Sequence, residues 1–192
     1  MATEEKQLLI AAVRRHAASP VVDEPSLLRA AVALIFTPGD DGFELCMIQR
    51  SEHPQDPWSG HMAFPGGRRE PVDSSSLETA IRETEEEIGV VLPMESFLGP
   101  LSPLRVPYRV SNKAMVIEPF VFCLENEMEP VPNGEVAGIY FFSLRSLRMG
   151  EGRGEFQLPH RGEDLSLDCI DQKGVRIWGL SLRMLDELLQ RF

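Results

Sequence analysis

One continuous stretch, residues 66–90, combines a sharp turn with a strongly acidic helix. Gly66 and Gly67 open it, and glycine pairs permit a tight turn and a close approach of the backbone to a ligand. Five residues recur at helical spacing and predict a helix that buries one face against a sheet: Leu77, Ala80, Ile81, Thr84 and Ile88. The stretch therefore predicts a turn followed by a helix packed on a sheet.

The helix has start and stop signals of its own. Ser75 followed three residues later by Glu78 is a capping-box pattern, with Asp73 and Ser74 as alternative caps. Gly89 stands where a glycine commonly ends a helix. Both ends of the helix are thus specified locally.

Three acids of this helix are predicted to share a face. Glu83, Glu86 and Glu87 stand at i, i+3 and i+4, where like charges repel one another. Such a cluster needs a counter-charge, and hard divalent cations prefer oxygen ligands. We therefore expect Mg²⁺ or Mn²⁺ to be bound by these three glutamates, with the carbonyl of Gly67 as a further ligand. Glu78 and Glu85 are expected to be solvated surface acids.

The stretch resembles the signature box of the Nudix hydrolases, whose second half reads Arg-Glu-U-x-Glu-Glu-x-Gly-U, with U a bulky apolar residue. Thr84 stands in for the first apolar position, and eight residues rather than seven separate the earlier acid, Asp73, from Arg82. The other positions of this half match: Arg82, Glu83, Glu86, Glu87, Gly89 and Val90.

The longer variant of the box is similar to the coenzyme A pyrophosphatase branch of this family. Twelve residues fall in its register: Gly66, Gly67, Asp73, Ser75, Thr79, Ala80, Arg82, Glu83, Glu86, Glu87, Ile88 and Gly89. The preceding segment departs from the branch pattern, because residues 52–62 lack its Arg-x-His and have Gly60-His61-Met62 in place of Gly-Gln-Val. The catalytic box therefore matches the branch better than the substrate segment does.

The resemblance implies an α/β/α sandwich with a mixed β-sheet and a metal-dependent hydrolysis of a pyrophosphate bond. Coenzyme A or an acyl derivative is the first substrate expected, giving 3′,5′-ADP and 4′-phosphopantetheine. ADP-ribose, nucleotide sugars and dinucleotides are the alternative substrates. A non-catalytic nucleotide-sensing module is a further alternative, although a sensor has no need of the intact Arg-Glu and Glu-Glu pairs.

The resemblance and the charges together give a candidate site. Catalytic roles are expected for Glu83 and Glu86, for Arg82 as the residue that orients and neutralises the acids, and for Glu135, which follows an Asn-Gly turn; Glu127 and Glu129 are the alternatives to Glu135. Asp73 is either a helix cap or an electrostatic partner. Substrate contacts are expected from Arg50, Arg68, Arg69 and Gly66, with a solvated loop as the alternative interpretation of Arg68 and Arg69.

Composition limits the partners. A net charge of −11 without a basic stripe argues against binding to nucleic acid, so a small nucleotide is the expected partner of a monomer or homodimer. No run of apolar residues is long enough to predict a membrane span, and the acidic N-terminus does not resemble a signal peptide. The three cysteines lack a Cys-x-x-Cys pair, and Cys46 and Cys123 are expected to be buried free thiols in a cytoplasmic protein.

The length of 192 residues suits a single domain, residues 1–192. Helices are predicted at its two ends, over 4–18 and 177–192, with a short third one near 144–149. Residues 150–162 are expected to be irregular because they are rich in glycine. Seven strands are predicted, of which the first two form a hairpin around residues 39–42: 30–36, 43–49, 62–64, 96–101, 115–124, 136–143 and 165–170.

Overall fold

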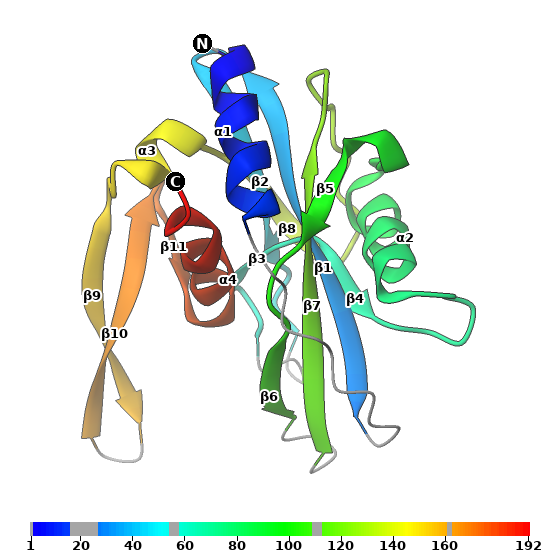
Figure 1. Ribbon diagram of the computed structural model, residues 1–192. Helices are drawn as coiled ribbons and strands as arrows, with labels where there is room; N and C mark the ends of the chain where they lie inside the picture. Colours follow the sequence, from blue (N-terminus) through cyan, green and yellow to red (C-terminus); the bar gives the residue numbers. More distant parts are fainter. Residues whose placement is uncertain (1, 16–26, 54–57, 109–112, 161–162) are drawn as a thin grey trace.

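The computed structural model describes residues 2–15, 27–53, 58–108, 113–160 and 163–192 (Figure 1). Its elements follow in chain order: α1 (Ala2–Arg14), β1 (Leu28–Gly39), β2 (Gly42–Arg50), β3 (Met62–Ala63), β4 (Gly66–Arg68), α2 (Ser76–Ile88), a 3₁₀ turn η1 (Met94–Ser96), β5 (Phe97–Pro100), β6 (Leu104–Tyr108), β7 (Lys113–Cys123), β8 (Val136–Ser143), α3 (Leu144–Arg148), β9 (Arg153–His160), β10 (Glu163–Gln172), β11 (Val175–Trp178) and α4 (Gly179–Leu189).

The main sheet is mixed, as predicted. Strand β1 runs parallel to β7 and forms the predicted antiparallel hairpin with β2. On the outer edge of β2 lies β8, and on the outer edge of β7 lie β5 and β6. Parallel pairing places β1 and β7 at the centre, where side chains are buried on both faces.

A short segment is inserted where β1 and β2 separate. The two strands pair only between residues 35–39 and 42–46. Beyond this point, β3 pairs with β2 at Ile48 and Gln49, while β4 pairs with β1 over Ala30–Val32. The turn from β3 to β4 is therefore held between two strands of the main sheet.

Helices cover both faces of this sheet, which confirms the expected three-layer sandwich. Ala33 and Ile35 of β1 belong to the core under α2, whereas Leu34 and Phe36 belong to the core under α1 and α4. This alternation is the two-residue period of a strand that is buried on both sides. Figure 1 shows α2 on one side of the sheet and α1 with α4 on the other.

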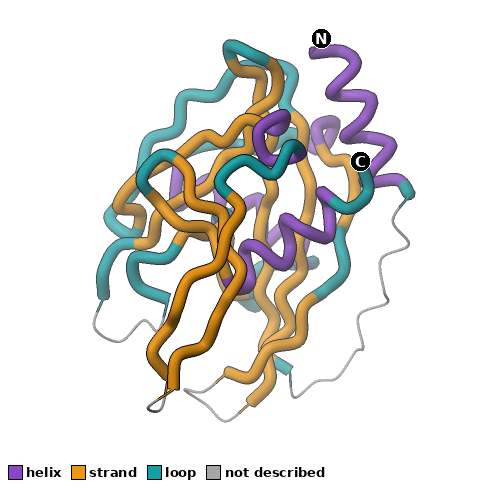
Figure 2. Tube along the Cα trace, turned by 90° about the vertical axis from the view of Figure 1, so that its left-hand side faces the viewer, coloured by secondary structure: helices purple, strands orange, loops and turns teal. Residues whose placement is uncertain are grey.

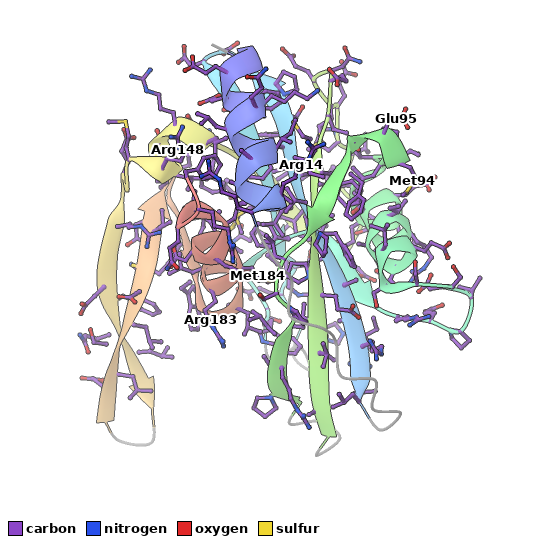
Figure 3. The ribbon with its side chains drawn as sticks, in the orientation of Figure 1. Arg14, Met94, Glu95, Arg148, Arg183 and Met184 are labelled. Atoms are coloured by element: carbon purple, nitrogen blue, oxygen red, sulfur yellow. The ribbon has the colours of Figure 1, made fainter. Side chains whose placement is uncertain are left out.

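The C-terminal helix is amphipathic but shorter than predicted. On α4, Met184 is buried while its neighbour Arg183 is exposed (Figure 3). The helix begins at Gly179 rather than at residue 177, because Val175–Trp178 form β11. A two-residue turn at Lys173 and Gly174, both at positive φ, joins β11 to β10.

The expectation of an irregular segment at 150–162 is wrong for β9. Strands β9 and β10 form a long antiparallel arm beside the body of the protein (Figure 2). Phe156 and Leu158 alternate with polar residues, which is a strand pattern, but Gly154 and Pro159 interrupt it. Strands β4 and β6 were not predicted either, since each is short and contains glycine or proline.

The remaining sequence-based expectations concern helices and thiols. Helix α1 ends at Arg14, and residues 16–18 of the predicted helix lie outside the described residues. Cys46 and Cys123 are buried free thiols, as predicted, and burial raises the pKa of Cys46 to about 12. No helix among the described residues is long and apolar enough to cross a membrane.

Helix α2 is fixed at its start by a network around Asp73. Ser75 is the N-cap, as the capping-box pattern predicts: its hydroxyl accepts from the amide of Glu78, 3.2 Å away. Asp73 is therefore not the cap. Its buried carboxylate accepts from Nε and Nη2 of Arg82 at 2.9 and 3.0 Å, from the Thr79 hydroxyl at 2.9 Å and from the Glu70 amide at 2.8 Å.

We predict that Asp73→Asn lowers the free energy of unfolding at pH 7 by about 1–3 kcal/mol, because buried donors lose a charged acceptor. The hydrogen bonds from Arg82 hold the pKa of Asp73 well below its usual range. The carboxylate of Asp73 therefore contributes its full stabilisation above the pKa of the unfolded state, about 4. This contribution is lost as the pH falls through the lower pKa of the folded state.

The difference between the wild type and Asp73→Asn should accordingly shrink in urea unfolding curves recorded below about pH 4. Asp164→Asn is the matched control, because Asp164 is exposed on the β9–β10 arm. Equal stability of Asp73→Asn and the wild type at pH 7 would contradict the network.

Candidate active site

Gly66 and Gly67, which follow the tight turn after β3 and begin β4, are called the glycine turn below. The glycine turn lies against α2, and Gly66 connects the two. Gly66 has φ +150°, and an added Cβ atom would lie 2.2 Å from the carbonyl oxygen of Ala31. Its amide donates to Oε2 of Glu87 at 2.9 Å. The position favours glycine, because a side chain here would push β4 away from β1.

Gly67 makes room for a second carboxylate. An added Cβ atom at this position would lie 2.4 Å from Cδ of Glu83 and 2.5 Å from both of its carboxylate oxygens. The carboxylate of Glu83 therefore rests directly on the backbone of the turn. Glu83 and Glu87, one helical turn apart, both approach this turn.

The carboxylate of Glu87 is the most deeply buried acid in the candidate site. The residue is 3% exposed, and among the described residues its carboxylate accepts one hydrogen bond, from Gly66. Burial raises the pKa of Glu87 to about 7, and the negative charges of Glu83 and Glu135 act in the same direction. Burial also raises the pKa of Glu83, although Arg82 opposes that shift. Two partly desolvated acids thus adjoin each other.

Arg82 links Asp73 to two glutamates of the helix. Besides Asp73, its guanidinium contacts Glu83 at 3.0 Å and Glu86 at 3.1 Å. The side chain of Glu86 is 55% exposed. The three predicted glutamates therefore differ in burial. Glu87 and Glu83, called the inward acids below, are the less exposed pair, and Glu86, which shares the guanidinium with Glu83, is the most exposed. Helical spacing alone does not fix how far a helix is rotated against its sheet.

Glu135 lies near the two inward acids although it is far from them in sequence. Its carbonyl oxygen accepts from the amide of Ser51 at 2.8 Å, so its backbone is fixed beside the end of β2. Its charge acts on both Glu83 and Glu87. The alternatives, Glu127 and Glu129, are exposed residues of the loop that precedes β8.

The three arginines have different surroundings. Arg50 is half-buried at the end of β2, and its charge lowers the pKa of Glu87 against the effect of burial. Arg69 donates to the carbonyl oxygens of Asp73 and Ser74 at 3.3 and 2.8 Å, so its side chain holds the loop before α2. Arg68 is exposed, and its carbonyl oxygen accepts from Arg82 at 3.2 Å. The structure thus brings Arg50 toward the inward acids and assigns Arg69 a structural contact.

The carboxylate oxygens of the inward acids are suitable ligands for a hard cation, although the side chains do not surround a single metal position. Within the described ranges, no three His, Cys, Asp or Glu side chains are arranged to hold a metal ion together. Glu83 and Glu87 nevertheless offer adjacent carboxylate oxygens, and Oε1 of Glu87 accepts no hydrogen bond from the described residues. Oxygen donors in a desolvated site suit Mg²⁺ or Mn²⁺ better than softer metals.

Thr84, which replaces an apolar residue of the signature, is fully buried, and its hydroxyl donates to the carbonyl oxygen of Ala80 at 2.7 Å. The hydroxyl is thereby satisfied within the helix.

Asn133 adds a contact that the sequence does not predict. The sequence marks it only as part of an Asn-Gly turn, whereas in the structure its side chain contacts both α2 and Glu135.

Known proteins share both the sequence pattern and the fold. The chain is 29% identical over 164 residues to "Nudix hydrolase 15, mitochondrial" of Arabidopsis thaliana, a match that covers 82% of this chain and 56% of the relative. It is 32% identical over 115 residues to the mouse "Peroxisomal coenzyme A diphosphatase NUDT7", covering 59% of this chain and 47% of the relative. The chain thus spans about half the length of these two proteins.

Solved structures agree in fold. The NUDIX domain of Shewanella oneidensis NrtR, crystallised with ADP ribose, is 18% identical with a TM-score of 0.58, and the match covers 91% of this chain and 94% of that one. A model of the NUDIX domain matches residues 27–159, which include the glycine turn, α2 and Glu135. Because this match spans more than half of the chain, the protein belongs to the Nudix family.

Proposed function

We propose that this protein is a divalent-cation-dependent pyrophosphohydrolase that cleaves a nucleoside diphosphate-linked substrate. The observation that carries the proposal is the pair of partly desolvated acids, Glu83 and Glu87, held against the Gly66–Gly67 turn. Burying acids beside each other costs stability. Cation binding provides a reason for that cost, and membership in a family of named hydrolases supports it.

Glu83, Glu86, Glu87 and the carbonyl of Gly67 are the residues that would hold Mg²⁺ or Mn²⁺. When bound, such an ion neutralises charge that develops on the diphosphate and acidifies an attacking water. Glu83 and Glu86 both contact Arg82, so a cation held by the two acids would have to displace this guanidinium from them. Arg82, by remaining on Asp73, would keep the helix in place during this exchange.

The other residues have roles that follow from their positions. Glu135, in the turn just before β8, acts on the charges of Glu83 and Glu87, so we assign it the proton of the attacking water. Arg50 is the arginine best placed to contact the diphosphate, since its charge reaches Glu87. Gly66 and Gly67 let the backbone lie close to β1 and to the carboxylate of Glu83, and a substrate contact by Gly66 stays a prediction.

Coenzyme A or an acyl derivative is the proposed substrate. Asp73, Ser75 and Thr79 match the pattern of the coenzyme A branch, and in the structure they form one hydrogen-bonded network at the start of α2. The similarity to the mouse coenzyme A diphosphatase supports the same choice. ADP-ribose, nucleotide sugars and dinucleotides are the alternatives, because residues 52–62 differ from the branch pattern. A cytoplasmic location and a monomeric or homodimeric state remain predictions.

The first prediction concerns the cation. Hydrolysis should stop in EDTA and return with Mg²⁺ or Mn²⁺. Glu87→Gln should lower kcat by at least about 100-fold, because even the partners of metal ligands are worth about 10- to 100-fold. In differential scanning fluorimetry Mn²⁺ should raise the Tm of the wild type, since a ligand that binds only the folded state stabilises it, and should fail to raise that of the variant.

Glu85→Gln is the matched control, because Glu85 lies on the same helix and is exposed. It should keep both the activity and the Mn²⁺-dependent rise in Tm. Full turnover in chelator would remove the proposed mechanism.

The second prediction concerns the base. Glu135→Gln should lower kcat by on the order of 10²–10⁴-fold, as expected for loss of a general base. The Tm should hardly change, because the side chain is exposed. Glu127→Gln and Glu129→Gln, tested in parallel, should be active; loss of activity in either of them, with an active Glu135→Gln, would move the role to the preceding loop.

The third prediction concerns the substrate. We expect kcat/KM for coenzyme A to exceed that for ADP-ribose, ADP-glucose and diadenosine polyphosphates, because specificity is expressed in this ratio. Product analysis by chromatography should show 3′,5′-ADP and 4′-phosphopantetheine. A clear preference for ADP-ribose or another sugar nucleotide would refute the coenzyme A assignment and leave the hydrolase assignment intact.

A further inference from the structure

The carboxyl end of α2 is capped by a segment that is distant in sequence. The last carbonyl groups of a helix have no partner within it. Here the amide of Val131 donates to the carbonyl oxygen of Ile88 at 2.8 Å, and the amide of Asn133 donates to that of Glu87 at 2.8 Å. The loop before β8 is thus attached to the same turn of helix that carries Glu86 and Glu87.

The side chain of Asn133 extends this attachment in two directions. Its Nδ2 donates to the carbonyl oxygen of Glu86 at 2.9 Å. Its Oδ1 accepts from the amide of Glu135 at 2.8 Å. One amide group therefore connects the backbone of an acid on α2 to the backbone of the acid on the loop.

The backbone of Glu135 is consequently fixed on both sides. Asn133 holds its amide, and the amide of Ser51, beyond the end of β2, holds its carbonyl oxygen at 2.8 Å. The Glu135 side chain has no comparable packing, because the residue is exposed. The position of its carboxylate relative to Glu83 and Glu87 is therefore set through the backbone.

We propose that Asn133 is a positioning residue: it sets the place of Glu135 relative to the inward acids of α2 by joining the two backbones. The inference rests on the proposed hydrolase function and on a role for Glu135 in it. The side chain of Asn133 binds backbone atoms of Glu86 and Glu135 rather than their carboxylates, and we assign it no contact with the substrate. Its effect on turnover must pass through Glu135.

A double-mutant cycle tests this. Asn133→Ala should lower kcat by about 10- to 100-fold with little change in KM, since a misplacement of about 1 Å can cost that much. In the Glu135→Gln background the same substitution should change kcat by no more than about twofold, because effects that act through one group are not additive. Asn126→Ala, in the same loop and also exposed, is the matched control and should be silent in both backgrounds.

A readout independent of activity is hydrogen exchange at the Glu135 amide, followed by NMR. Exchange should accelerate in Asn133→Ala and stay slow in Asn126→Ala. Asn133→Ser supplies a hydroxyl that can accept from the amide two residues on in place of Oδ1, so it should keep a higher kcat than Asn133→Ala. It also takes the place of the alanine variant in the cycle if that variant does not fold.

Two outcomes would overturn the inference: an equal loss of kcat from Asn133→Ala in both backgrounds, which indicates a structural role, or a silent Glu135→Gln. In either case, a wild type that hydrolyses a pyrophosphate keeps the proposed function. Absence of hydrolysis by the wild type on every pyrophosphate substrate would instead defeat the proposed function itself.

Discussion

The hydrogen bond from the amide of Gly66 to the carboxylate of Glu87 is the contact on which the candidate site depends. It joins the segment inserted between β1 and β2 to the helix that carries the acids. Gly66 must be glycine for β4 to approach β1, and Gly67 must be glycine for Glu83 to approach the turn. The backbone of β4 and the carboxylates of α2 therefore meet at one place, and a side chain at either glycine would separate them.

Electrostatic repulsion among the acids of the site must be offset by the residues around them. Glu83 and Glu87 are partly desolvated beside each other, and Glu135 adds a third charge from the turn before β8. The guanidinium of Arg82 contacts Glu83 and Glu86 and is itself bound by the buried carboxylate of Asp73. The repulsion from Glu83 and Glu135 still helps to raise the pKa of Glu87. A bound cation would offset this repulsion, which links the stability of the helix to the chemistry that we propose.

Local signals predicted much of this arrangement, and long-range pairing accounts for most of the rest. The cap at Ser75, the glycine at Gly89 and the β1–β2 hairpin each depend on a few neighbouring residues, and the structure has them where the sequence places them. Strand β4 owes its conformation to β1, which no local pattern contains. The burial of Glu87 and the exposure of Glu86 follow from how α2 is rotated on the sheet.

We propose that Glu83 and Glu87 form a cation site beside the glycine turn. The most direct measurement is an anomalous difference map from crystals grown with Mn²⁺. A cation site here predicts a peak within bonding distance of both carboxylates and of the carbonyl of Gly67, and the loss of this peak in crystals of Glu87→Gln. Strong Mn²⁺ peaks that lie only elsewhere on the protein, with Glu87 still bound to Gly66 alone, would contradict it.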